Sequence, residues 1–317
     1  MKLIIVNYHY IDDEQKYKSG IYPVSPERLS DQLDKIGKTF DFIGEKELLD
    51  VIEGKNNLSK NSCLITFDDG LRVQYERAVP ILAAKKIPAI FFINTRPLSK
   101  GIACVVHKIH FLLTILPADA FLEKVLFYYK AIVGRALNEE ELFKDRTVNY
   151  PDDEAATSQL KYLLNSYLEP DLSEQITDMI FRLYCDDEAE FCEKLYMSKE
   201  QLLTLRQNKL FSLGLHTASH IDISAFDKDK VAQDIMENYN YFQKYLSMDA
   251  VSGLSFPYGL VNEQVIRGKI EPLADTLGIK YALTTYKGIN YDLNKPLFLK
   301  RFDANDVIGG KRPIVNF

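Results

Sequence analysis

The chain has 317 residues, of which 46% are hydrophobic, 26% charged and 12% aromatic. This composition is ordinary for a globular protein and excludes collagenous, coiled-coil and disordered chains. A formal net charge of −6 excludes the basic surface that nucleic-acid-binding proteins carry. The four cysteines have no metal-type spacing, so we expect free thiols in a reducing compartment.

The apolar segments bear on the location of the protein. The apolar run at residues 3–6 is shorter than the core of a signal peptide, and acidic residues follow from Asp12. No apolar stretch approaches the roughly 20 residues that span a membrane. We therefore expect a cytoplasmic protein with no membrane span and no nucleic-acid partner.

Short apolar runs alternate with helical segments along most of the chain. Several runs lack a polar face, which is typical of parallel strands covered on both sides. Ser25-Pro26 is a helix start with proline at the first helical position, and Asp227 can cap a helix at 228–245. Eight rounds of this alternation predict an α/β barrel or a doubly wound sheet. The predicted strands lie at 3–10, 41–44, 62–67, 87–93, 211–216, 253–256, 281–285 and 297–301.

The segment 97–195 interrupts the alternation, because its apolar residues have helical spacing only. Residues 138–192 hold 15 acidic and four basic side chains, a net charge of −11 against −6 for the whole chain. We interpret the segment as a helical insertion within a single domain over 1–317, with its acidic residues on a solvated face. We expect the insertion to limit substrate size or to form a contact in a homo-oligomer.

Two adjacent carboxylates, Asp68 and Asp69, follow the apolar strand at 62–67. Ionised groups at the end of a buried strand are costly unless they bind a metal or take part in catalysis. Neighbours in a strand point to opposite sides, so a turn beginning at Asp68, which Gly70 permits, is needed to bring both into one pocket. Capping of the next helix, or a phosphatase or receiver-domain site, would also explain the pair.

Two of the five histidines, His216 and His220, stand four residues apart just after the strand at 211–216. At that spacing both imidazoles can bind one metal ion. Two histidines and one carboxylate, with positions left open for water, form a ligand set typical of hydrolytic zinc sites.

A third turn, Phe256-Pro257-Tyr258-Gly259, follows the strand at 253–256. Proline restricts its own backbone and glycine permits a sharp exit. Such a rigid turn could direct the backbone N–H of Tyr258 at a developing oxyanion. Taken alone, the segment indicates only a turn.

In this order the three segments resemble the polysaccharide deacetylases, carbohydrate esterases of family 4 with the NodB-homology domain. The family motif T-F-D-D-G is complete at 66–70 and H-[ST]-x-x-H at 216–220, whereas R-x-P-Y is replaced by Ser255-Phe256-Pro257-Tyr258. The resemblance covers 1–100 and 195–317. It implies a distorted (β/α) barrel of the NodB type, similar to a TIM barrel, with its site at the carboxyl ends of the strands.

The resemblance also implies roles for individual residues. Asp68 resembles the catalytic base, and Asp69, His216 and His220 resemble the ligands of a divalent metal ion, which we expect to be zinc. The backbone amide of Tyr258 would contribute to an oxyanion hole. The implied reaction is hydrolysis of an N-acyl group, acetyl in the first place, from an amino sugar.

The sequence departs from the family pattern in three of the expected motifs. Ser255 stands where the family has the arginine that orients the base, and the terminal L-x-H motif has no histidine within 297–301. No tryptophan is present to build the fourth motif. His9 is our candidate for the missing general acid, since the strand at 3–10 would neighbour the last strand of a closed barrel. Exported poly-N-acetylglucosamine deacetylases begin with a segment similar to Tyr8-His9, and this resemblance supports His9 as the acid. The alternative is that His9 has only a structural role at the rim of the barrel.

The substrate is inferred only from the expected location. A free, nucleotide-linked or lipid-linked sugar precursor of a surface glycan fits a cytoplasmic enzyme better than a mature wall polymer does. Two other functions stay open. The departures from the family motifs would suit a catalytically weak or inactive barrel that binds glycan or metal or serves as an interaction module. The carboxylates would also suit a metal phosphohydrolase.

Overall fold

The computed structural model describes residues 2–17, 20–58, 60–137, 153–259 and 261–315. They divide into two compact units. The barrel unit comprises Met1–Asp12, Val24–Ile102 and Cys192–Phe317, and the helical unit comprises Asp13–Pro23 and Ala103–Phe191. The insertion expected at 97–195 therefore differs in extent from the helical unit, because residues 97–102 and 192–195 belong to the barrel unit.

The described part of the barrel unit contains an eight-stranded sheet in which every pairing is parallel. The strand order is β7-β6-β5-β4-β3-β1-β8, and β2 lies beside the first half of β3. This confirms the predicted α/β class and brings the carboxyl ends of the strands to one edge. The strands are β1 (Leu3–Tyr8), β2 (Asp41–Ile43), β3 (Ser62–Phe67), β4 (Ala89–Ile93), β5 (Phe211–Leu215), β6 (Gly253–Ser255), β7 (Tyr281–Leu283) and β8 (Phe302–Asp303).

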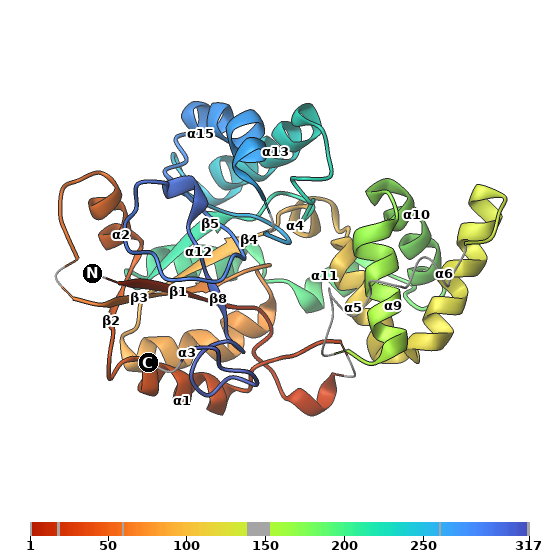
Figure 1. Cartoon of the computed structure of the whole chain (residues 1–317), viewed down its shortest axis with the longest axis horizontal. Coiled ribbons are helices and arrows are strands. Elements are labelled where there is room, and N and C mark those ends of the chain that lie inside the picture. The colour runs from red at the N-terminus through yellow and green to blue at the C-terminus, as the bar shows by residue number, and fades with distance from the viewer. Residues whose placement is uncertain (1, 18–19, 59, 138–152, 260, 316–317) are drawn as a thin grey trace. The chain divides into compact units, whose positions relative to one another are not determined.

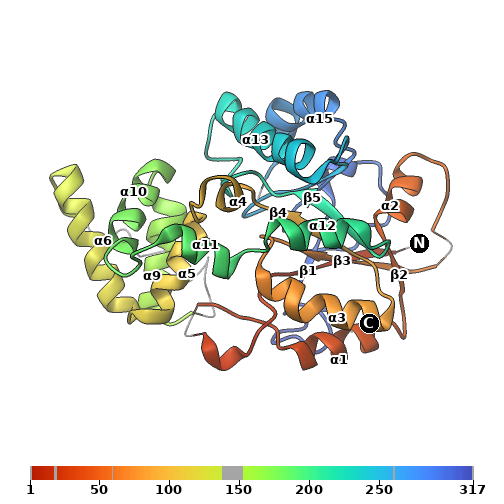
Figure 2. The same cartoon turned by 180° about the vertical axis from the view of Figure 1, so that it is seen from behind.

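Helices surround the curled sheet: α1 and α3 lie on one side of the barrel, and α13 and α15 lie on the opposite side (Figures 1 and 2). The predicted caps are present, since the Ser25 side chain accepts from the N–H of Arg28 and Asp227 accepts from that of Lys230. The α-helices of the barrel unit are α1 (Pro26–Ile36), α2 (Glu45–Ile52), α3 (Val79–Lys85), α4 (Arg96–Lys100), α12 (Lys199–Gln207), α13 (Lys228–Leu246), α14 (Glu263–Val265) and α15 (Glu271–Leu277).

The segment around Leu299 joins the two ends of the sheet. The N–H of Leu299 donates to the carbonyl of Ala282 in β7 at 3.0 Å, and the carbonyl of Leu299 accepts from the N–H of Thr284 at 2.9 Å. The chain then continues into β8, which pairs with β1. These bonds close the curled sheet into the distorted (β/α) barrel that the sequence predicts.

The last strand differs from the prediction at 297–301. Pro296–Phe298 is a 3₁₀ turn, and the paired strand β8 begins only at Phe302. Proline fixes its backbone and lacks a donor, which favours the turn. Within 299–303 the chain forms hydrogen bonds first with β7, through Leu299, and then with β1, through β8. It therefore forms no continuous ladder with either strand.

The two faces of the sheet pack into separate cores. The helices pack on an outer core, whereas an inner core contains Leu3, Ile5, Leu64, Ile90 and Phe92 with five further residues. Side chains alternate between faces along a strand. Asn7 therefore lies on the same face as Leu3 and Ile5, and Asp68 lies on the same face as Leu64. Both place polar groups at the carboxyl end of the inner core.

The helical unit has a hydrophobic core of its own. Most of the apolar residues with helical spacing are buried, whereas Ile132, Tyr167, Met179 and Leu183 are between 38% and 56% exposed. No helix of the described residues is long and apolar enough to cross a membrane. The α-helices are α5 (Val105–Ile115), α6 (Ala118–Val133), α9 (Ala155–Tyr162), α10 (Pro170–Phe181) and α11 (Glu188–Leu195), whose end belongs to the barrel unit.

Candidate metal centre and active site

Asp69, His216 and His220 converge at the carboxyl ends of β3 and β5. Their ligand atoms lie within 4.8 Å of one another. Asp69 Oδ1 is 3.3 Å from Nε2 of His216 and 3.4 Å from Nε2 of His220. Ligands about 2.0–2.2 Å from a tetrahedral zinc ion lie roughly 3.3–3.6 Å apart. The donor types and their spacing thus fit one divalent ion.

The His216 ring is held in the tautomer that a metal needs. Its Nδ1 lies 2.8 Å from the carbonyl oxygen of Ser255. A carbonyl can only accept, so Nδ1 carries the proton and the lone pair of Nε2 faces Asp69. Burial lowers the pKa of His216, but the nearby charges of Asp68 and Asp69 outweigh it and raise that pKa. The pocket therefore attracts a positive charge.

Backbone conformations that L-residues rarely adopt gather at the three motifs. Asp69, Thr217, His220 and Tyr258 have φ between 59° and 78°. In the described chain, the other two such non-glycine residues are Lys86 and Ser247, both helix C-caps. The left-handed backbone at Asp69 supplies a turn between the two carboxylates, and both lie near His216. Such conformations cost on the order of 1–3 kcal/mol each, so the surroundings must hold them.

Helix α13 provides part of that support. Asp234 Oδ1 accepts from the N–H groups of Ala218 and Ser219 at 2.6 and 3.1 Å, and its other oxygen accepts from the Ser219 hydroxyl. One turn later, Asn238 accepts from the N–H of His216 at 3.0 Å and donates to the Ile93 carbonyl at 3.0 Å. Two residues on one helix face therefore fix the loop that carries both histidines.

Asp68 lies next to the candidate metal ligands but is held by a different set of residues. Arg301 Nη1 donates to Oδ1 at 3.0 Å, and Nη2 lies 2.9 Å from Oδ2. Asn7 and Ser255 each donate to Oδ2 at 3.0 Å. Burial alone would raise the pKa of Asp68, but the charges of Arg301, His216 and His9 lower it to about 2. The carboxylate is thus ionised at neutral pH.

The sequence analysis did not find these supporting residues. Ser255 was expected only to lack the family arginine, and no supporting role was expected of Arg301. A buried carboxylate that lacks its expected cation needs another, and Arg301 stands in a Leu-x-Arg segment where Leu-x-His was expected. The sequence therefore contained a signal that could have identified Arg301 as the cation beside Asp68. The roles of Asp234 and Asn238 carried no comparable signal, because polar residues on an amphipathic helix are expected to face solvent.

His9 lies at the same edge of the barrel. It is partly buried and follows Tyr8, which pairs in register with Phe67, the residue before Asp68. Gln74 Nε2 joins the two segments by donating to the carbonyls of His9 at 3.0 Å and Asp68 at 2.6 Å. His9 is also close enough for its charge to affect the pKa of Asp68. Its role as the general acid stays a prediction.

Tyr258 packs its ring edge-to-face with His220, with ring centroids 5.0 Å apart. Its carbonyl accepts from the Thr285 hydroxyl at 3.0 Å. A Cβ on the following residue, Gly259, would come within 2.3 Å of the Thr285 side chain, so glycine is required there. The turn is therefore held rigidly, while the oxyanion role of the Tyr258 amide stays a prediction.

The other two histidines lie in the helical unit. His107 and His110 are on α5, with ring centroids 5.9 Å apart, and His107 is buried. This agrees with the packing role that their apolar surroundings indicate.

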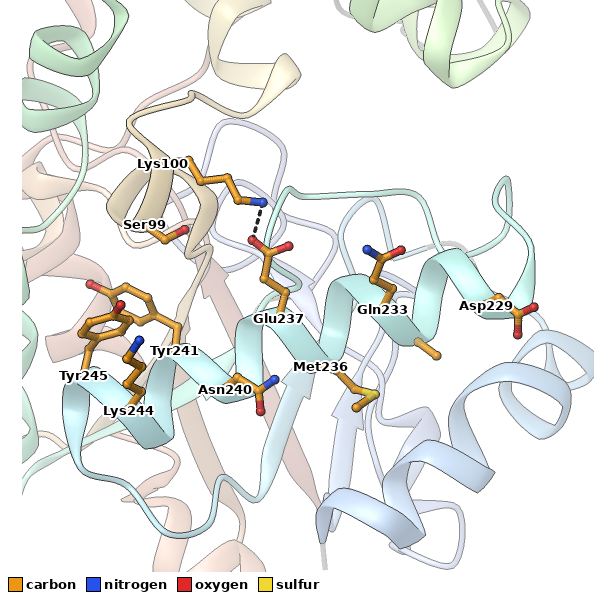
Figure 3. A pocket seen from close by; sticks show the side chains of 11 residues that line it. Ser99, Lys100, Asp229, Gln233, Met236, Glu237, Asn240, Tyr241, Lys244 and Tyr245 are labelled. Atoms are coloured by element: carbon orange, nitrogen blue, oxygen red, sulfur yellow. Dashed lines mark ion pairs between the residues drawn. The ribbon is translucent and has the colours of Figure 1, made fainter.

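A separate hollow of about 660 Å³ lies along the outer face of α13 and beside α4 (Figure 3). Lys100 and Glu237 form an ion pair of 2.6 Å across it. No candidate site residue lines this hollow. Gln233 and Glu237 thus face it from α13, whereas Asp234 and Asn238 on the same helix hold the histidine loop.

Comparisons with known proteins show which family and which folds the chain resembles. A family model described as Polysaccharide deacetylase matches residues 55–163 and 182–281. No curated protein matches the chain in sequence.

Several solved structures share the fold. The deacetylase PplD of Streptococcus pyogenes, determined in complex with acetate, is 16% identical, with 96% of this chain and 92% of that chain covered and a TM-score of 0.59. IcaB of Ammonifex degensii is 17% identical, with 95% and 90% covered and a TM-score of 0.56. The BpsB deacetylase domain of Bordetella bronchiseptica is 15% identical, with 95% of each chain covered and a TM-score of 0.55. At these identities the likeness shows a shared fold. The family model, however, matches more than half of the chain, and the protein therefore belongs to the polysaccharide deacetylase family.

Proposed function

We propose that the protein uses a divalent metal ion to hydrolyse the N-acyl group, acetyl in the first place, of an amino sugar. Its family supports carbohydrate deacetylation as the reaction. The observation that carries the proposal is the division of the carboxylate pair. Asp69 lies against both histidines, whereas Asp68 is bound by Arg301, Asn7 and Ser255 and stays ionised beside them.

The residues divide the chemistry among them. Asp69, His216 and His220 would hold the ion, for which zinc suits two imidazoles and one carboxylate. A bound ion would lower the pKa of water and polarise the acyl carbonyl. Asp68, kept ionised by its partners, accepts the proton of the attacking water. The amide of Tyr258 donates to the developing oxyanion.

His9 completes the proposed site by protonating the departing amine. Without a proton the tetrahedral intermediate reverts to the amide. Histidine titrates near neutral pH, and His9 is at the same barrel edge as Asp68. Arg301 cannot take the role, because guanidinium does not release its proton.

The alternative functions are less well supported. A barrel that only binds metal or glycan has no need of an ionised carboxylate beside the ligands. A phosphohydrolase would use cationic groups to bind phosphate. The guanidinium of Arg301 is instead directed at Asp68 and at the Thr284 carbonyl, 2.9 Å from its Nε.

The substrate and the helical unit belong to the same proposal. A free, nucleotide-linked or lipid-linked precursor of a surface glycan in the cytoplasm stays our expected substrate. We retain the interpretation of 97–195 as an insertion that limits substrate size or contacts a second copy. Light scattering of the purified protein tests the second role.

The experiment that tests the function is mass spectrometry of products. Zinc-loaded protein is incubated with N-acetylated monosaccharides, sugar nucleotides and short N-acetylglucosamine oligomers. Release of acetate together with the matching free amine is expected from at least one class, and none from the Asp68→Asn variant. Stoichiometric zinc without turnover of any class would favour the binding module, and release of inorganic phosphate would favour the phosphohydrolase.

A further inference from the structure

Asp68 is contacted by side chains from three distant parts of the chain. Asn7 extends from β1, Ser255 from β6 and Arg301 from the closing segment before β8. Both members of the Asp68–Arg301 pair are 2% exposed. A carboxylate in such a place keeps its charge only when cations and donors surround it.

Arg301 is itself fixed on the side away from Asp68. Its Nε donates to the Thr284 carbonyl at 2.9 Å, and its backbone N–H donates to Tyr286 at 3.0 Å. The guanidinium is planar, so fixing Nε also fixes the plane in which Nη1 and Nη2 meet the carboxylate. A lysine would supply the charge but not the plane.

Position 255 reaches the carboxylate from β6, and position 301 reaches it from the closing segment before β8. Ser255 is fully buried and its hydroxyl touches Asp68 Oδ2, so a side chain at 255 is directed at the carboxylate. The serine hydroxyl reaches the carboxylate but carries no charge. The long side chain that does so comes from 301.

We infer that Arg301 is the positioning residue of the base: its fixed guanidinium orients Asp68 beside the metal ligands, in place of a cation at position 255. The inference rests on the proposed function, in which Asp68 is the base. It predicts that the guanidinium can be moved from 301 to 255 with partial return of activity. An ion pair that only stabilises the fold would not behave in this way.

Four variants test the inference. Arg301→Met removes the charge and keeps the length, and Arg301→Lys keeps the charge without the fork. Arg301→Ser is compared with the double variant Ser255→Arg/Arg301→Ser, which relocates the guanidinium. Arg267→Met, at an arginine whose side chain is 72% exposed, is the matched control and is expected to behave like the wild type.

The kinetic result separates positioning from binding. Arg301→Met should lower kcat by about 10²–10³-fold, the loss typical of one preorganised donor, with KM within about threefold and zinc content unchanged. Arg301→Lys should fall between Arg301→Met and the wild type. The double variant should exceed Arg301→Ser by at least about tenfold. A kcat for Arg301→Met within about threefold of wild type, or no gain in a folded double variant, would overturn the inference.

Crystal structures of zinc-loaded wild type, Arg301→Lys and the double variant supply a readout that needs no turnover. In the double variant we expect the introduced guanidinium to contact Asp68 and the carboxylate to keep its wild-type orientation. In Arg301→Lys the carboxylate should rotate, because the ammonium lacks the fork. An unchanged carboxylate in Arg301→Lys would refute positioning even if the Met variant does not fold. If the wild type hydrolyses nothing, the proposed function fails and these orientations still decide the role of Arg301.

Discussion

The two halves of the site are built in different ways. The metal half uses Asp69, His216 and His220, which follow β3 and β5 within short contiguous motifs. The base half joins Asp68 to Asn7, Ser255 and Arg301, which come from the first strand, a middle strand and the closing segment. The candidate ligands thus lie in local motifs, whereas the surroundings of Asp68, the proposed base, depend on closure of the whole barrel.

The largest expected effect is the loss of both bound zinc and turnover when a residue of the metal half is removed. His216→Ala should lose bound zinc, because two ligands remain and the tautomer-fixed imidazole is gone. Turnover should then fall to background. Elemental analysis of purified protein measures the loss, with His110→Ala on α5 as the control for histidine removal. Full zinc occupancy in both His216→Ala and His220→Ala would contradict the ligand assignment.

Asp68→Asn should break only the base half. We expect kcat to fall by about 10²–10⁴-fold while zinc content stays at the wild-type level. Asp69→Asn, one residue away, is the matched variant and should lose zinc. Equal loss of zinc in the two variants would mean that both carboxylates are ligands. Unchanged turnover in Asp68→Asn would favour a different base.

His9→Ala extends the comparison to the proton donor. A loss of kcat of up to about 10²–10⁴-fold with unchanged zinc is expected of a general acid. Steady-state kinetics and elemental analysis measure the two quantities, with His110→Ala again as the control. Should His110→Ala lower kcat and His9→Ala leave it intact, the acid would have to be sought in the helical unit.

The smallest effect concerns the support of the histidine loop. Asp234→Ala should weaken zinc binding by about 10–100-fold, the range for residues that orient metal ligands. Gln233→Ala changes the neighbouring exposed residue, which faces the hollow of Figure 3, and should leave zinc affinity unchanged. Competition with a chelator measures both affinities. Equal affinities would show that the left-handed loop holds its conformation without Asp234.

The parallel α/β fold and the helix caps at Ser25 and Asp227 were predictable from the sequence, and so was the convergence of the candidate ligands Asp69, His216 and His220. Each depends on residues a few positions apart: strand and helix periods, an N-cap and its helix, or two histidines in one loop. Such patterns report local geometry directly. The parallel order then brings the ends of β3 and β5 to one edge without further information, because β4, the strand between them in the sheet, also runs parallel to both.

The position of the last strand, the membership of Asp13–Pro23 in the helical unit and the partner of the base were decided only in the tertiary structure. Asp68 and Arg301 are 233 residues apart, and no local period relates them. Their contact exists because Leu299 bonds to the β7 side while the next residues pair with β1. Closure carries Arg301 over the inner core, where a buried carboxylate and a fixed guanidinium satisfy each other.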